Sequence, residues 1–345
     1  MGIECISLFS GAGGLDFGAK SAGVDITHFI ENDSDSIETL KLNNRHKGEI
    51  LKEDVSDFPF KKLKKGKKQI IIGGPPCQPF SKNGYWIKNA NRKIDLDPRN
   101  MIDQYVRSVD EIKPSGFLFE NVESMLHPTN INTTNKFLRD VKAIGYRTLL
   151  YKANALDFGV PQKRKRIFIF GVKNKNVNLF EPGRTHADPN SIDLLTSNLP
   201  SHKNVGEFIK EFRFKKYSET YEDASKGTYY KELCAVVPGK NYMCLTELDN
   251  YDGKTFEKGK RFWNFLYKLS PDEPSITIAA QPGPWVGPFH WDNRRLRVPE
   301  IAAIQTFPKN YKFFGSRRSV QKQIGNAVPC LLGQRMVEHL IDLVT

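Results

Sequence analysis

Short apolar runs alternate with helical patterns over the first 170 residues, and this alternation limits the fold more than any other feature. The apolar runs have the length and composition of buried strands and lie at residues 6–9, 26–30, 70–72, 117–119 and 167–170. Residues 101–112 and 137–144 place apolar side chains at three-and-four spacing, which is typical of helices. Strands that alternate with helices form a mostly parallel sheet covered on both faces, so we expect an α/β fold.

The composition and the pattern of the sequence change after about residue 172. The segment up to about residue 291 is polar and irregular, rich in Asn, Lys, Tyr and Pro, and lacks the strand–helix alternation. A helical pattern returns at residues 299–308, and residues 331–343 have the apolar spacing of a packed helix. We therefore expect a smaller region of variable loops, followed by a C-terminal segment that returns to the first domain.

Charge and cysteine usage narrow the class of partner and the compartment. The chain has 345 residues, a net charge of +13 and a pI of about 9.3, which favour a polyanionic partner such as nucleic acid. The five cysteines form no C-x-x-C pair, so neither a disulfide framework nor a zinc site is indicated. The sequence has neither an apolar run of about 18 residues nor a secretory signal pattern, so we expect a cytoplasmic protein without a membrane span.

A glycine-rich turn, Phe9-Ser10-Gly11-Ala12-Gly13-Gly14, follows the first expected strand and opens a helix. Glycines at such a turn let the backbone approach a ligand closely. Asp16 occupies the last position of the G-x-G-x-x-G pattern, which weighs against a dinucleotide fingerprint, and the sequence has no P-loop motif. Glu31 ends the second strand, where an acid can accept hydrogen bonds from ribose hydroxyls. Asp54 follows at the end of the next unit and could accept one from an adenine amino group.

A cysteine framed by prolines follows the apolar run at residues 70–72. The segment Gly73-Gly74-Pro75-Pro76-Cys77-Gln78-Pro79 places one sulfur at a strand end, on a backbone with little freedom. Such a thiol is either packed in a proline-rich turn, since free cysteine behaves as a small hydrophobe, or presented as a nucleophile. This segment alone leaves both interpretations open.

Six motifs in the chain occur in the order of a known family. They are the turn at residues 9–14, Pro75-Pro76-Cys77-Gln78, Glu120-Asn121-Val122, Gln162-Lys163-Arg164-Lys165-Arg166, Arg295-Leu296 with Glu300, and Gln323-Ile324-Gly325-Asn326-Ala327-Val328-Pro329. In these motifs the chain resembles the bacterial DNA cytosine-C5 methyltransferases of restriction-modification systems, which use S-adenosylmethionine. The resemblance covers about residues 3–171 and 290–345. The chain departs from the family at Lys165, where an acid is usual.

The resemblance implies an architecture. We expect a Rossmann-like methyltransferase sheet with helices on both faces in a catalytic domain at residues 1–171. A smaller, irregular target-recognition domain would follow at residues 172–289, and residues 290–345 would return to the catalytic domain. In the family the segment at residues 82–100 closes over the DNA, and Arg295 and Glu300 are expected to support the recognition region.

The resemblance also implies a mechanism. Cytosine C5 is a poor nucleophile, and addition of the Cys77 thiolate to C6 would convert the ring into an enamine-like species that is nucleophilic at C5. Glu120 would protonate N3, which requires that it hold a proton near neutral pH. Arg164 and Arg166 alternate, so in an extended segment they would share one face and hold cytosine O2, steady Glu120 or bind phosphate. The target base must be rotated out of the duplex, and water is the expected acceptor of the C5 proton.

The implied cofactor is S-adenosylmethionine, with S-adenosylhomocysteine as product and no metal ion. The resemblance places the cofactor contacts at Phe9, Ser10, Gly11, Ala12, Gly13, Gly14, Glu31, Asn32, Asp54, Val55, Pro76 and Asn326. The implied partner is double-stranded DNA. We also expect a monomer, with a cognate restriction endonuclease acting on the same site without forming a stable complex.

Three alternatives compete with this interpretation. An RNA cytosine methyltransferase would use the same chemistry, but the Cys-Phe-Thr tripeptide of the relative that modifies tRNA does not occur in the sequence, which favours DNA. A catalytically silent DNA-binding relative is disfavoured because Cys77 and Glu120 are both present. A nicotinamide-dependent oxidoreductase is disfavoured by Asp16 in the glycine pattern.

Overall fold

The computed structural model describes residues 3–43, 48–63, 68–76, 101–174, 176–188, 198–247, 256, 259 and 261–345. The chain forms two compact units. Unit 1 consists of Met1–Asn154, Lys165–Arg184 and Val328–Thr345, and unit 2 consists of Ala155–Arg164 and Thr185–Ala327. Cys77 and the expected closing segment at residues 82–100 lie outside the described residues.

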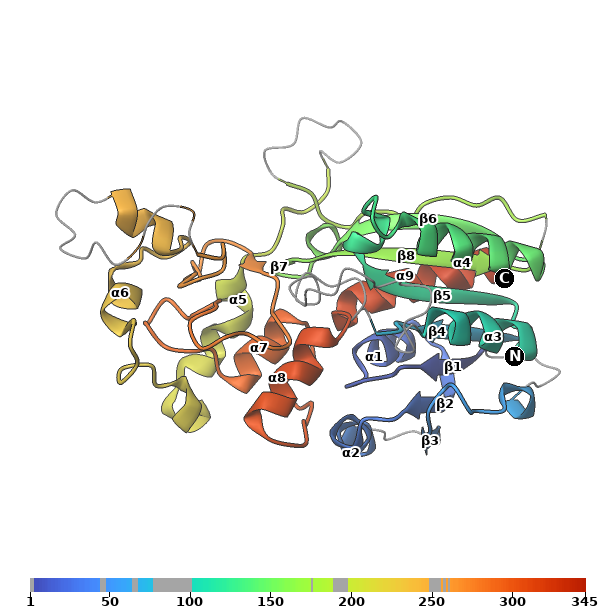
Figure 1. Cartoon of the computed structure of the whole chain (residues 1–345), viewed down its shortest axis with the longest axis horizontal. Coiled ribbons are helices and arrows are strands. Elements are labelled where there is room, and N and C mark those ends of the chain that lie inside the picture. Colours follow the sequence, from blue (N-terminus) through green and yellow to red (C-terminus); the bar gives the residue numbers. More distant parts are fainter. Residues whose placement is uncertain are drawn as a thin grey trace. The chain divides into compact units, whose positions relative to one another are not determined.

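Unit 1 is built on a seven-stranded sheet with the strand order β3-β2-β1-β4-β5-β8-β6 (Figure 1). The parallel strands are β1 (Glu4–Leu8), β2 (Asp25–Glu31), β3 (Glu49–Lys52), β4 (Gln69–Gly73) and β5 (Gly116–Val122). Strand β8 (Lys165–Val172) is antiparallel to both β5 and β6 (Arg147–Asn154). The carboxyl ends of the parallel strands lie at one edge of the sheet, where ligands bind in open α/β folds.

Helices pack on both faces of this sheet. The helices of unit 1 are α1 (Gly14–Ser21), α2 (Ser34–Asn43), α3 (Ile102–Ile112), α4 (Ile131–Ala143) and α9 (Cys330–Val344). Strand side chains alternate between the two faces of the sheet. On one face Phe117 packs into the cluster that holds Tyr105 of α3 and Phe137 of α4. On strand β8 the ring of Phe170 lies 5.0 Å from the ring of His339 on α9. The predicted α/β fold class is confirmed.

Helix α9 brings the C-terminus of the chain back to the first helix of unit 1. A Cβ atom added to Gly18 of α1 would lie 2.4 Å from the backbone nitrogen of Gln334, so only glycine fits at this contact. Gly333 of α9 also lies close to Leu15, with 3.2 Å between an added Cβ and the leucine Cδ1, which is tighter than most such contacts. The helix predicted at residues 331–343 and its return to the first domain are therefore present in the structure.

One acid is buried in this helical layer. Asp16, in the first turn of α1, is 2% exposed, and neither carboxylate oxygen has a hydrogen-bond partner within the described residues. Burial raises the pKa of Asp16 from 3.8 to about 6. Ionised Asp16 therefore destabilises the folded state above pH 6, by about 3 kcal/mol at most, and this cost disappears as the pH falls towards 4.

Replacing Asp16 with Asn should remove that cost. We expect the Asp16→Asn variant to gain up to about 3 kcal/mol of unfolding free energy at pH 8 and to match the wild type near pH 4. Urea unfolding across this pH range measures the difference. The same substitution at exposed Asp57 serves as a control without the pH-dependent gain. A gain at Asp16 that is constant with pH would contradict the explanation.

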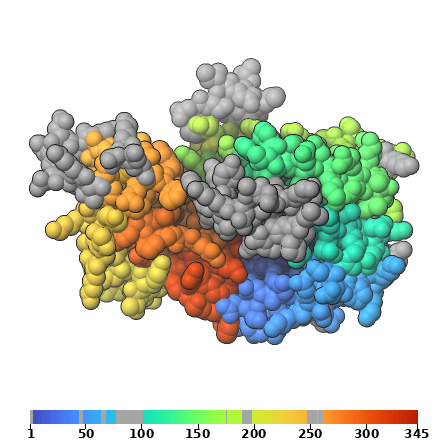
Figure 2. Space-filling view, viewed as in Figure 1, coloured from blue at the N-terminus to red at the C-terminus, as the bar shows by residue number. Residues whose placement is uncertain are grey.

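Unit 2 is mostly irregular, as the polar composition predicts. Within the described residues its α-helices and strands are α5 (Val205–Ile209), α6 (Tyr230–Ala235), α7 (Val298–Ile304), α8 (Arg317–Asn326) and the paired strands β7 (Gln162–Lys163) and β9 (Ser275–Ile276). An aromatic-rich cluster that includes Tyr242, Phe265 and Phe289 forms a core within it. In the space-filling view, the yellow to orange surface belongs to this unit (Figure 2).

The unit boundaries differ from those expected for the domains. Residues 290–327 belong to unit 2, and only the chain from Val328 onwards joins unit 1. Arg297 explains part of the difference, because its guanidinium pairs with Glu222 and donates to the backbone oxygen of Phe214. Within the described residues, no helix has the length and apolar content required to cross a membrane.

Candidate active site

The turn after β1 has the backbone geometry that its glycines allow. Gly11 and Gly13 have φ angles of 54° and 79°, and Gly13 is the N-cap of α1. Phe9, which is not a glycine, also has a positive φ angle of 55°. Strain of this kind in a non-glycine residue is concentrated at functional sites. Ser10, Ala12 and Gly14 are buried, so the turn is held firmly against the sheet.

Glu31 at the end of β2 ties the glycine turn to the neighbouring strand. Its Oε2 accepts a hydrogen bond from the backbone nitrogen of Gly11 at 2.7 Å. Its Oε1 accepts from the backbone nitrogens of Asn32 and Asp33 at 2.9 and 2.8 Å. Burial raises the pKa of Glu31, although the three N–H donors oppose this shift. The carboxylate is thus fixed beside the turn.

The loop after β3 supplies a second acid. The Oδ1 of Asp54 accepts a hydrogen bond from the backbone nitrogen of Ser56 at 2.8 Å, and this bond lowers the pKa of Asp54. The Nδ2 of Asn32 lies 3.5 Å from Asp54 Oδ2. Val55 is buried, and its carbonyl oxygen accepts from the guanidinium of Arg107 on α3. Arg107 therefore fixes this loop, a role that the sequence analysis missed because no motif marks it.

Because β3, β2 and β1 are adjacent and parallel, the glycine turn, Glu31 and Asp54 lie along one edge of the sheet. The site offers open backbone at Gly11, where an added Cβ would meet nothing closer than 4.0 Å, together with two carboxylates. Hydroxyl and amino groups of a nucleoside are the donors that such carboxylates accept. These residues therefore fit a nucleoside-containing cofactor.

Glu120 and Arg166 form an ion pair between β5, which lies next to β4, and β8. Glu120 lies on β5 and is 8% exposed, and its Oε1 is 3.0 Å from Nε of Arg166 on β8. Arg166 is paired with Val122 across the two strands, so Glu120 lies two residues away on the same face of the sheet. Of the roles considered for the two arginines, steadying Glu120 is the one that these contacts support for Arg166.

The segment leading to Cys77 packs against this pair. A Cβ atom added to Gly74 would lie 2.6 Å from Glu120 Oε2, so a larger residue there would displace the Glu120 carboxylate. The Nδ2 of Asn121 donates to the carbonyl oxygen of Pro75 at 3.2 Å. Pro76, the last described residue of the segment, is exposed. Glu120 and Asn121 therefore fix the chain immediately before Cys77, which itself lies outside the described residues.

Arg164 has a different environment from Arg166. It belongs to unit 2 and is 0% exposed, and its Nη2 donates to the carbonyl oxygens of Gly325 and Ala327, at 2.9 Å each. These carbonyls lie at the C-terminal end of α8, where a cation is stabilising. Arg164 thus holds the end of a helix within unit 2. Asn326 ends the same helix in unit 2 and is exposed.

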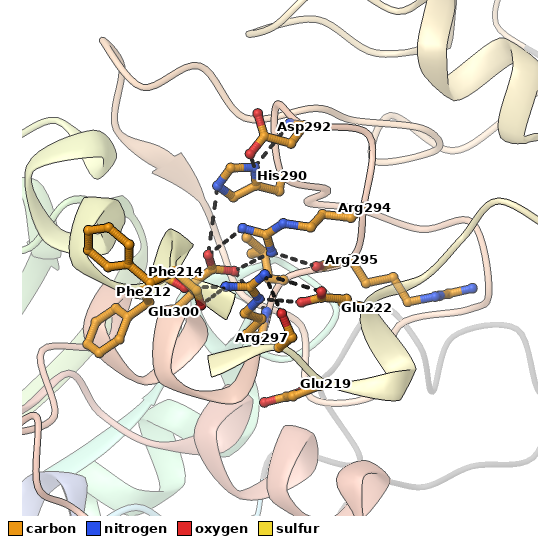
Figure 3. Close-up of polar contacts among 12 residues, drawn as sticks. Phe212, Phe214, Glu219, Glu222, His290, Asp292, Arg294, Arg295, Arg297 and Glu300 are labelled. Atoms are coloured by element: carbon orange, nitrogen blue, oxygen red, sulfur yellow. Dashed lines mark hydrogen bonds and ion pairs between the residues drawn. The ribbon is translucent and has the colours of Figure 1, made fainter. Parts of the chain in front are cut away.

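The support expected from Arg295 and Glu300 involves different arginines. Glu300 is fully buried and forms a two-pronged ion pair with Arg294, with nitrogen–oxygen distances of 2.8 and 2.6 Å (Figure 3). Its Oε2 also accepts from the backbone nitrogen of Arg297 at 2.9 Å. Burial lowers the pKa of the adjacent His290 to about 3, so this imidazole is neutral. Arg294 and Arg297 therefore stabilise unit 2.

No group of three or more metal-ligating side chains occurs among the residues that the structure describes.

Comparison with known proteins identifies the family of the chain. The family model of the C-5 cytosine-specific DNA methylases matches residues 3–342. The type II methyltransferase M.SacI of Streptomyces achromogenes is 35% identical, over 99% of this chain and 93% of its own length. M.FnuDI of Fusobacterium nucleatum, also a type II methyltransferase, is 30% identical over 99% of this chain and 96% of its own length.

Among solved structures, the Entamoeba histolytica methyltransferase EhMeth has a TM-score of 0.66 at 15% identity, over 99% of this chain and 98% of that one. At this identity the likeness concerns the fold alone. The family match and the curated relatives carry the assignment further, because they span nearly the whole chain. The chain belongs to the C-5 cytosine-specific DNA methylases, and it is a DNA cytosine-5-methyltransferase of the bacterial type II kind.

Proposed function

We propose that this enzyme methylates one cytosine within a specific double-stranded DNA sequence, as the modification enzyme that protects DNA from a cognate endonuclease. Membership of the C-5 cytosine-specific DNA methylases and the net charge of +13 support DNA as the substrate. In this proposal unit 1 carries catalysis and unit 2 reads the sequence. The enzyme acts in the cytosol as a monomer and forms no stable complex with the endonuclease.

The residues at the edge formed by β1, β2 and β3 fit S-adenosylmethionine, the cofactor of this family. In the proposal Glu31 accepts the ribose hydroxyls, Asp54 accepts the adenine amino group, and Phe9 and Val55 supply apolar surface. Bound there, the cofactor supplies an electrophilic methyl group. The glycine turn, Asn32 and Pro76 complete the proposed contacts of unit 1.

Catalysis is assigned to Cys77, Glu120 and Arg166. The thiolate of Cys77 adds to C6 of a cytosine rotated out of the duplex, while Glu120 delivers a proton to N3. Arg166 acts as a positioning residue, since it fixes the carboxyl group of Glu120. After methylation the C5 proton passes to water and Cys77 is eliminated. Arg164 is left out of this mechanism because its guanidinium is fully buried against α8.

One observation carries the proposal. The Glu120–Arg166 pair packs against Gly74, three residues before Cys77, so the acid lies beside the backbone that delivers the nucleophile. The test is to incubate the purified protein with S-adenosylmethionine labelled in its methyl group and with duplex DNA or tRNA. We expect label at C5 of cytosine in DNA only, and bisulfite sequencing should locate it within one recurring sequence. Label in tRNA alone would overturn the proposal.

The role of Glu31 can be tested separately from catalysis. Replacing Glu31 with Ala removes an acceptor whose hydrogen bonds to the ribose are charge-assisted, so we expect S-adenosylmethionine to bind about tenfold to a hundredfold more weakly. Isothermal titration calorimetry measures this affinity. The Glu38→Gln variant, altered on helix α2, provides the control. Unchanged cofactor affinity in the Glu31 variant would exclude this acid from the cofactor site.

A further inference from the structure

Arg295 lies next to the ion-pair cluster of unit 2 without taking part in its ion pairs. Figure 3 shows its side chain extending away from Glu222 and Glu300, whereas Arg294 and Arg297 point towards them. The Arg295 guanidinium carbon lies 5.0 Å from the ring centroid of Tyr221. The same carbon lies 5.9 and 6.0 Å from the rings of Trp285 and Phe289. Arg295 is thus held against aromatic rings.

Two of these rings, those of Tyr221 and Phe289, line an open cleft within unit 2, to which Arg295 also contributes. Apolar residues form most of its wall, among them Ile278, Pro282, Val286 and Leu296. Tyr221 is 46% exposed and also contacts a second arginine, Arg317, whose guanidinium carbon is 4.7 Å from the ring centroid. The cleft therefore combines apolar and aromatic surface with two cationic groups.

The two arginines differ in how many of their donors are engaged. Arg317 uses all three of its nitrogens, which bond to Glu219 at 3.2 Å, to Gln321 at 3.0 Å and to the carbonyl oxygen of Leu296 at 2.9 Å. Arg295 donates through Nη1 to the carbonyl oxygen of Pro284 at 2.8 Å. Within the described residues, its Nε and Nη2 have no hydrogen-bond partner. These two N–H groups form the parallel fork that recognises two acceptors at once.

A base edge fits this fork better than a phosphate group does. The rings of Tyr221 and Phe289 line the cleft beside the guanidinium, and aromatic surface suits a flat base better than a phosphate, which carries strongly bound water. The O6 and N7 atoms of guanine match a guanidinium fork in the major groove, and this is the commonest specific contact of arginine with DNA. Every site that contains a cytosine in duplex DNA also contains a guanine opposite it.

We propose that Arg295 determines specificity by binding the O6 and N7 edge of one guanine in the target sequence. The proposal rests on the proposed function, because it requires that the enzyme methylate duplex DNA. It moves Arg295 from the supporting role expected from the sequence to direct recognition. The contacts with Tyr221 and Trp285 fix the position of the guanidinium before DNA arrives, which reduces the entropy lost on binding.

The test compares the wild type with Arg295→Ala and Arg295→Lys on the duplex that bisulfite sequencing identifies. Companion duplexes carry 7-deazaguanine at one guanine position at a time, which removes the N7 acceptor. We expect Arg295→Ala to lower kcat/KM on the cognate duplex by about tenfold to a hundredfold. With the wild type, one 7-deazaguanine duplex should have a lower kcat/KM than the cognate duplex. With Arg295→Ala, the same two duplexes should have equal kcat/KM. Lysine should not restore activity, because it lacks the fork.

Arg213→Ala is the matched control, because this exposed arginine of unit 2 also lies over an aromatic ring, 6.0 Å from the centroid of Phe214. Unchanged thermal unfolding of both alanine variants excludes misfolding. A different set of results would show that Arg295 contacts the DNA phosphate backbone and would overturn the proposal. In that case lysine restores activity, the alanine variant loses activity equally on all duplexes, and the salt dependence of its DNA binding falls by about one phosphate contact. Unchanged sequence preference would overturn it as well. A wild type that methylates no DNA would instead refute the proposed function.

Discussion

Replacing Cys77 with Ser is expected to reduce methyl transfer by at least about a thousandfold, while S-adenosylmethionine binds as before. The reason is chemical: a serine hydroxyl is far less acidic than a thiol, so it provides almost no anion to add to C6 at neutral pH. The proposed cofactor contacts at Glu31 and the glycine turn are untouched by this change. Single-turnover transfer of a labelled methyl group measures the first effect, and calorimetry measures the second.

A second cysteine offers the control for this variant. Cys234 is exposed and free, and it lies in unit 2, so Cys234→Ser should retain full activity. The pair of variants separates a nucleophile from a general sensitivity to losing a thiol. Methyl transfer near the wild-type rate in the Cys77 variant would remove Cys77 from the mechanism.

The second large effect is expected at Glu120. Glutamine has the same size and still offers an oxygen to Arg166, so Glu120→Gln should fold normally and keep its packing against Gly74. It cannot deliver a proton to N3, and the loss of general acid catalysis should lower kcat by about 10²- to 10⁴-fold. We expect the KM for DNA to change little, because the interaction of Glu120 with N3 strengthens only as the cytosine ring is attacked. Steady-state kinetics on the cognate duplex separates the two parameters.

Glu123→Gln is the matched control for Glu120. Glu123 follows on the same segment, in the 3-10 helix Glu123–Leu126, and has no role in the proposal. Its substitution should leave kcat unchanged. If Glu120→Gln raised KM and left kcat intact, the acid would serve only to bind DNA.

Residues at strand ends were predictable from the sequence because a short local pattern places them. The apolar run of β1 followed by Phe9 to Gly14, and the acid closing β2, require only that neighbouring parallel strands end together. The proximity of Glu120 to the Cys77 segment follows from the same rule, since β5 lies beside β4. The fold class followed from the alternation of strands and helices.

Contacts between distant residues were not predictable in this way. The shared face expected for Arg164 and Arg166 assumed one extended segment, but Arg164 lies between β7 and β8 and caps α8, more than 150 residues later in the chain. The pairing of Arg297 with Glu222 within unit 2 is likewise revealed by no local pattern. The site assignments themselves, Cys77 above all, stay predictions until they are measured.

The covalent step is the central claim, and trapping it tests the account most directly. In DNA whose cytosines carry fluorine at C5, the enzyme can add to C6 and transfer the methyl group, but no C5 proton is available to leave, so Cys77 cannot be eliminated. Mass spectrometry of the digested complex then identifies the attached residue. The account predicts one cofactor-dependent adduct, on the peptide containing Cys77. An adduct on Cys5, Cys234, Cys244 or Cys330, or no adduct from an enzyme that methylates ordinary DNA, would contradict it.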